Sequence, residues 1–118
     1  MNLSLRVLLF ALSAAAQETY TGWVSDAGCA RSRAASGIYT ATNPDCARRC
    51  VKEGKDVVLV SEELKKVFAV DNADALTPQI GNKVRVSANT VATEKIHLNK
   101  VELLEKGSAQ CARPPMKK

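Results

Sequence analysis

Apolar and polar residues alternate strictly in two segments of the second half of the chain, 83–88 and 95–98. A period of two is typical of strands with one face in the core and the other in solvent. The intervening segment, 89–93, is expected to be a turn. The positions expected to face inward are Val84, Val86, Ala88, Ile96 and Leu98.

The last of these strands changes its pattern partway along. Val101 and Leu103 are apolar, but they fall on the opposite parity from the preceding inward positions. One extra residue in a strand shifts the face on which its side chains lie. We therefore expect a β-bulge near Asn99 or Lys100.

Two earlier strands are predicted at 56–60 and 66–70, where β-branched residues dominate. Phe68, in the second of these, is expected in the core. The segment 71–79 is predicted to be a connector with a short helix, because Pro78 interrupts any longer one.

The first part of the chain has a weaker pattern. Residues 19–25 favour a strand, and Gly22 in its interior indicates a bulge or a close backbone approach. Trp23 is expected in the core. The segment 26–42 is rich in Ser, Gly, Ala and Arg, so we expect a loop there.

A helix is predicted directly after this loop. Asn43 is suited to the N-cap, Pro44 to the first helical position, and Asp45 to the positive end of the helix dipole. The helix is expected to run to about Glu53, where Gly54 ends it.

These elements define the expected fold class. The chain is predicted to be mainly β with one or two short helices. Five short strands, with a helical connector before the last pair, favour a small five-stranded OB-like barrel. The alternative is an open antiparallel sheet with one packed helix.

The N-terminus predicts export. Residues 1–16 have the pattern of a secretory signal peptide: Arg6 precedes an apolar run at 7–12 that is too short to span a bilayer. Alanines at 14–16 offer a cleavage site before Gln17. We therefore expect a periplasmic or secreted protein without a membrane span.

The length and net charge of the chain limit the number of domains and the class of protein. The 118 residues suit one domain, carry a net charge of +5, and include only 4% aromatic residues. A large multidomain enzyme and a polytopic membrane protein are excluded. We expect one OB-like domain at 17–106, with a cysteine-bearing loop and helix at 26–54 and a mobile basic tail at 107–118.

The four cysteines are Cys29, Cys46, Cys50 and Cys111. An even number of cysteines in a small exported chain favours disulfides. Cys46 and Cys50 are four residues apart on the predicted helix, so both are expected to face the loop that carries Cys29. Three full pairings remain open, of which a direct Cys46–Cys50 bond ranks last because it strains a helix.

A thiolate metal site is the alternative use of these residues. Cys29, Cys46 and Cys50 would supply three thiolates, and Asp26 or Cys111 would be the fourth ligand. Soft thiolates favour zinc or cuprous copper. The spacing matches no common zinc motif and contains no C-x-x-C pair. The simpler interpretation of Asp26 is that it shapes a turn.

Basic residues cluster around the cysteines and predict either a solvated surface or an anion-binding face. The predicted partners are thus an anionic ligand or an envelope protein, whereas few exposed aromatics and export disfavour nucleic acid. The lone His97 has no nucleophile or orienting group in a recognisable pattern, so catalysis is not predicted. The basic residues concerned are Arg31, Arg33, Arg48, Arg49 and Lys52.

Three stretches of the chain are similar to motifs of a known group of proteins. They are GWVSDAGC at 22–29, DCARRCVKEG at 45–54, and GNKVRV at 81–86. Together they resemble a group of small exported bacterial proteins of unknown function, with G-x-[IV]-S-D-x-x-C, then C-x-x-x-C-V-x-x-G, then an OB-like β domain. The resemblance implies the fold but no activity. Those proteins often have a histidine soon after the first cysteine; here 30–33 is ARSR, which weighs against a metal site.

The sequence thus favours an exported, disulfide-stabilised, non-enzymatic binding module. A thiolate metal-binding or redox protein using Cys29, Cys46 and Cys50 is the alternative. A polyanion or nucleic-acid binder with a basic face is the second alternative.

Overall fold

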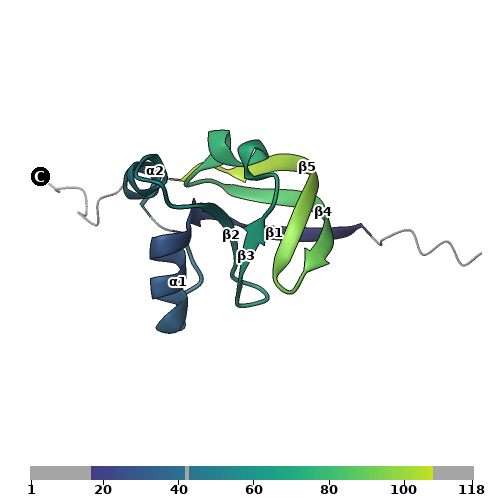
Figure 1. Cartoon of the computed structure of the whole chain (residues 1–118), viewed down its shortest axis with the longest axis horizontal. Coiled ribbons are helices and arrows are strands. Elements are labelled where there is room, and N and C mark those ends of the chain that lie inside the picture. Colours follow the sequence, from purple (N-terminus) through teal and green to yellow (C-terminus); the bar gives the residue numbers. More distant parts are fainter. Residues whose placement is uncertain (1–16, 42, 108–118) are drawn as a thin grey trace, which may run out of the picture.

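The computed structural model describes residues 17–41 and 43–107. Within them the chain is mainly β, as predicted, with five strands and two α-helices (Figure 1). The predicted signal peptide, Cys111 and nearly all of the predicted tail lie outside the described residues. The elements are β1 (Glu18–Asp26), α1 (Ala27–Ala35), α2 (Pro44–Lys52), β2 (Val57–Ser61), β3 (Lys66–Val70), 3₁₀ turns at Ala73–Ala75 and Thr77–Gln79, β4 (Lys83–Ala92) and β5 (Lys95–Glu105).

The five strands form one mixed sheet. Their pairing order is β1-β2-β3-β5-β4, and β1 pairs with both β2 and β4, so that the order returns to its start. All neighbours are antiparallel except β3 and β5, which are parallel. The expected alternative, a wholly antiparallel open sheet with one helix, is therefore wrong in both pairing and helix number.

The main core lies on the inner face of the strands. The five positions predicted to face inward on β4 and β5 are at most 5% exposed, and Phe68 is equally buried. A second, smaller cluster lies on the outer side of β2 and β3, beneath α1, and consists of Ala30, Val58, Val60 and Val67. Because β2 packs against both clusters, all five of its residues are buried, which explains its continuous apolar run.

Two local predictions in the strands are confirmed. In the β4–β5 pairing, Ser87 lies opposite Lys100 and Ala88 opposite Leu98, which leaves Asn99 as the bulged residue. On β1, a Cβ added to Gly22 would lie 2.4 Å from the carbonyl oxygen of Val60. The backbones of β1 and β2 thus approach too closely for any side chain at Gly22.

Three predictions in these regions are wrong. Residues 27–35 form α1 rather than a loop. The Asp26 side chain caps this helix, and the alanines of α1 favour helical structure, although only Ala30 is buried. The expected turn at 89–93 is too long, since β4 continues to Ala92 before a tight turn. Trp23 is half-buried beside the second cluster rather than in the main core.

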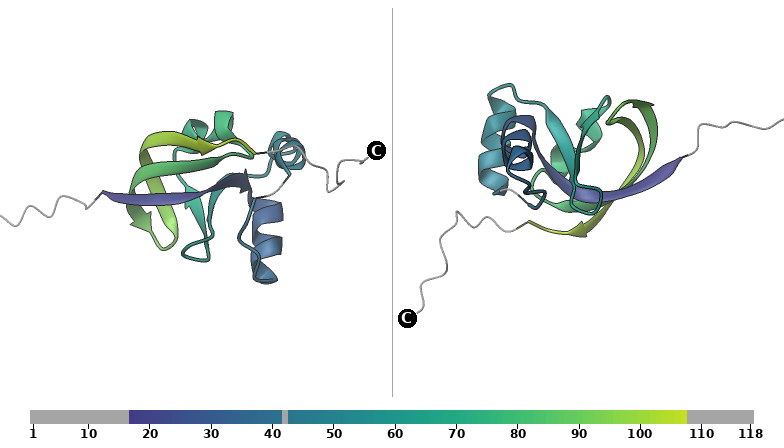
Figure 2. Two further views of the ribbon diagram at one scale, coloured as in Figure 1. Left: turned by 180° about the vertical axis from the view of Figure 1, so that it is seen from behind. Right: turned by 90° about the horizontal axis from the view of Figure 1, so that it is seen from below.

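The helix α2 begins as predicted. The Asn43 side chain accepts hydrogen bonds from the backbone N–H groups of Asp45 and Cys46, and Pro44 is the first helical residue. Figure 2 shows α1 and α2 on the same side of the strands, with their ends close together. Neither helix, among the residues described, is long and apolar enough to cross a membrane.

Candidate metal centre

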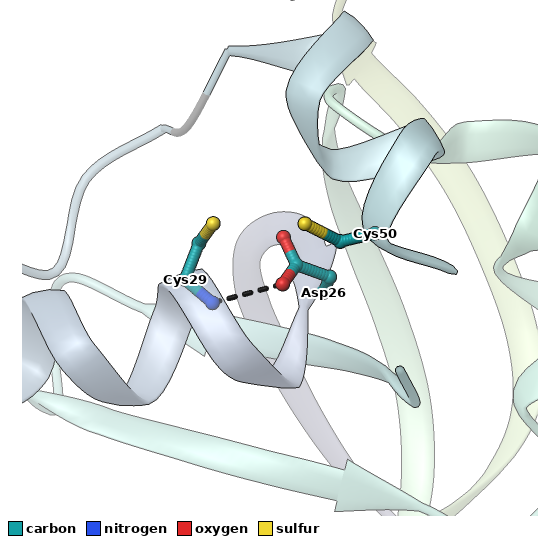
Figure 3. A group of neighbouring side chains, drawn as sticks. All are labelled: Asp26, Cys29 and Cys50. Carbon is teal, nitrogen blue, oxygen red and sulfur yellow. Dashed lines mark hydrogen bonds between the residues drawn. The ribbon is translucent and has the colours of Figure 1, made fainter. Parts of the chain in front are cut away.

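Asp26 stands where β1 ends and α1 begins. Its side chain is completely buried, and its Oδ2 accepts a hydrogen bond of 2.8 Å from the backbone N–H of Cys29 (Figure 3). This contact is an ordinary N-cap. The other carboxylate oxygen, Oδ1, is also buried but has no hydrogen-bond partner. Because an unpaired buried carboxylate oxygen is costly, this atom is suited to a ligand.

Two thiols lie beside this oxygen. Cys29 is in the first turn of α1, and Cys50 is in the second half of α2. One ligand atom from each of Asp26, Cys29 and Cys50 lies within 4.8 Å of the others. In Figure 3 both sulfurs and the upper carboxylate oxygen converge on one space between the two helices. We call these three residues the thiol-carboxylate site.

The surroundings of Cys29 favour its protonated form while no cation is present. Burial contributes most, followed by the negative charge of Asp26, the hydrogen bond between the Cys29 thiol and the Asp26 carboxylate, and the neighbouring Cys50 thiol. Together they raise the pKa of the Cys29 thiol from 9.0 to about 11. A metal cation at this point would reverse the effect, because it stabilises thiolates.

Cys46 does not join this site. It is exposed and one helical turn before Cys50, whereas the sequence predicted that both would face Cys29. Four residues advance a helix by about 6 Å. Of the two cysteines on α2, only Cys50 brings its sulfur within 4.8 Å of ligand atoms of Asp26 and Cys29.

The predicted disulfides are not formed in this structure. Cys29, Cys46 and Cys50 are free thiols, and Cys111 lies outside the described residues. Of the predicted pairings, the structure brings Cys29 near Cys50 rather than near Cys46.

The five predicted anion-binding residues differ in their surroundings. Arg33 donates hydrogen bonds to Thr40 Oγ1 and the Ala41 carbonyl, and so holds the loop after α1. On α2, Arg48 pairs with Asp45 at 3.0 Å, while Arg49 and Lys52 are exposed. Arg31 instead lines a separate pocket beside the strand hairpins.

His97 has a partner that the sequence did not predict. Its Nδ1 lies 2.7 Å from Asp71 Oδ1 at the surface, and nearly half of the His97 side chain is exposed. The two residues are 26 positions apart, and only the parallel pairing of β3 with β5 brings them together.

Comparison with protein-family models, with curated proteins and with solved structures gives no match. The interpretation of this site therefore depends on its own geometry and chemistry.

Proposed function

We propose that this protein is a zinc-binding module that holds the ion with Asp26, Cys29 and Cys50. The observation that carries this proposal is the convergence of three donors within 4.8 Å, one of them a fully buried carboxylate with an unpartnered oxygen. A tetrahedral zinc site with bonds of roughly 2.0–2.3 Å sets its ligands roughly 3.3–3.8 Å apart. Small side-chain adjustments therefore suffice.

The mixture of donors favours zinc over the other ions considered. Two thiols are too soft for magnesium or calcium, which take oxygen ligands. Cuprous copper takes thiolates readily, but the carboxylate adds little for so soft an ion. Zinc accepts both sulfur and carboxylate oxygen.

Three protein ligands leave the fourth position of zinc open to water or to a ligand atom from another molecule. The chain's one histidine is engaged with Asp71, so it supplies no base at this site. We therefore propose binding rather than catalysis. The segment 30–33 contains no histidine, so the proposed protein ligands are Asp26, Cys29 and Cys50 alone.

Cobalt substitution tests the proposal directly. Co²⁺ added to the reduced protein should give thiolate-to-cobalt charge-transfer absorption, and Zn²⁺ should displace it. Cys29→Ser and Cys50→Ser should abolish or strongly reduce the signal. Cys46→Ser is the matched control, because it removes a thiol from the same helix one turn away and should leave the signal unchanged. Equal loss in all three variants, or no signal in the wild type, contradicts the proposal.

A second candidate is the disulfide-stabilised binding module expected from the sequence. The proximity of the Cys29 and Cys50 thiols favours it, since a bond of about 2 Å needs only a modest approach of the two helices. Intact mass after alkylation without reduction, on protein from the exported fraction, separates the candidates. If Cys29 and Cys50 escape labelling and zinc removal does not expose them, the disulfide replaces the zinc site.

The proposal also includes an OB-like barrel fold and export from the cytoplasm. The double pairing of β1, the parallel contact of β3 with β5, and the helical connector before β4 support an OB-like barrel. Export, proposed from residues 1–16, is testable by fractionation and N-terminal sequencing, with Gln17 as the expected first residue.

A further inference from the structure

An open pocket of about 380 Å³ lies away from the thiol-carboxylate site. It is lined by residues of α1, of the loop that follows it, and of the β2–β3 and β4–β5 hairpins. In Figure 1 the C-terminal end of α1 and both hairpin tips point to the same side of the molecule. We call it the hairpin pocket.

The pocket gathers positive charge. Arg31 from α1 faces Lys65 and Lys66 from the β2–β3 hairpin, and the one acid in the lining is Glu94. The ion pairs found in the described part of the chain involve other residues. Three cations and one carboxylate leave a formal charge of +2, because 3 − 1 = 2. Such a pocket is complementary to a compact dianion.

The backbone holds the rim of the pocket in a defined shape. Lys65 and Glu94 have φ values of 54° and 51°, and they are the two non-glycine residues with positive φ in the described chain. Each lies at a hairpin tip. The second hairpin is also attached to β3, since the Ala69 N–H donates to the Glu94 carbonyl at 2.9 Å. The hydrogen bond to Ala69 thus anchors the backbone of Glu94 beside β3.

We propose that the hairpin pocket binds the phosphate group of a small phosphate ester. The Arg31 guanidinium is suited to two phosphate oxygens, and the two lysines add point charges. Tyr39 supplies a hydroxyl donor at the wall, and buried Val67 gives an apolar floor for the organic part of the ligand. Glu94 disfavours a third negative charge and accepts a hydrogen bond from a hydroxyl group on the ligand.

Titration with inorganic phosphate and with glycerol phosphate, followed by amide NMR at constant ionic strength, tests this proposal. Saturable shifts should appear around residues 31–39, 65–67 and 94, with tighter binding of the ester. Arg31→Gln should weaken binding about tenfold, since a charge-assisted contact contributes that much. Glu94→Gln should tighten binding.

Arg49→Gln is the matched control, because it removes an exposed arginine from the other helix. It should leave the affinity unchanged. Equal weakening by Arg31→Gln and Arg49→Gln would mean that only net charge matters, and it would overturn the proposal. Preferential binding of a single-stranded oligonucleotide with a steep salt dependence would overturn it as well. Far-UV circular dichroism of each variant confirms that the fold is retained.

Discussion

The two helices begin with the same kind of cap and use it differently. At α2, one oxygen of Asn43 accepts from two backbone N–H groups, and the residue is partly exposed. At α1, Asp26 is fully buried, uses one oxygen for the cap, and leaves the other without a partner. A cap that serves only the helix needs neither the burial nor the charge of Asp26. Asn43 also has a buried atom without a partner, but that atom is the amide Nδ2, which is a donor. Of the two caps, only Asp26 leaves an acceptor oxygen unpartnered, and only an acceptor can bind a cation.

The largest expected effect comes from adding zinc. An ion that binds only the folded state should raise the free energy of unfolding by about 2.7 kcal/mol at roughly 100 times its dissociation constant. Thermal unfolding under reducing conditions, with and without Zn²⁺, measures this effect. Cys46→Ser should respond as the wild type does, and Cys29→Ser should not respond. A similar response from Cys29→Ser would place the ion elsewhere.

Removing the two caps should separate their roles. Asn43→Ala and Asp26→Ala should each lower the free energy of unfolding by about 1 kcal/mol through loss of an N-cap. Only Asp26→Ala should also weaken zinc binding. Asp26→Asn keeps a capping oxygen without the charge, so it should preserve stability and still lose affinity. Urea unfolding and cobalt titration of the three variants provide both measurements.

A separate, pH-dependent effect is expected in the metal-free protein at alkaline pH. The Cys29 thiol ionises near 9.0 when exposed but near 11 in the folded chain, because of burial and Asp26. Between these values the unfolded state loses a proton that the folded state keeps. Stability should therefore fall as pH rises from 9 toward 11. The difference in unfolding free energy between wild type and Cys29→Ser isolates this component; a difference independent of pH would contradict it.

The smallest effect is expected on the exposed surface of α2. Arg48 and Asp45 form an ion pair at 3.0 Å, and more than half of each side chain is exposed. Arg48→Gln should change the free energy of unfolding by only a few tenths of a kcal/mol. It should leave zinc affinity unaltered. Chemical unfolding at low and high salt checks the first expectation, and a loss above about 1 kcal/mol would show that α2 depends on its surface charges more than its cap.

The parts of the fold that follow from local pattern could be predicted. The alternation at 83–88 and 95–98 identified the inner faces, and the change of parity predicted a bulge near Asn99 or Lys100, which the register of β4 with β5 confirms. Asn43 and Pro44 marked the start of α2. The helix α1 was missed because its cap belongs to the end of a strand, and because only Ala30 is buried, so no apolar periodicity appears.

The sequence predicted a set of residues that includes the candidate site, but it could not tell which cysteine of α2 belongs to the site. Asp26, Cys29 and Cys50 were all among the proposed ligands, and Cys46 was not separable from Cys50 by spacing alone. The choice between them depends on where α1 meets α2, which is a tertiary contact. The hairpin pocket could not be predicted for the same reason, since Arg31 on α1 lines one pocket with Lys65 and Lys66 only in the folded chain.

The position of Asp26 restricts what evolution can do there. The same side chain must fit a space with no access to solvent at the end of β1, cap α1 through one oxygen, and present a charge between two thiols. Aspartate meets all three demands, and asparagine meets the first two. Replacement by asparagine would thus keep the architecture and remove the charge between the thiols, whereas replacement by alanine would remove the cap of α1 as well.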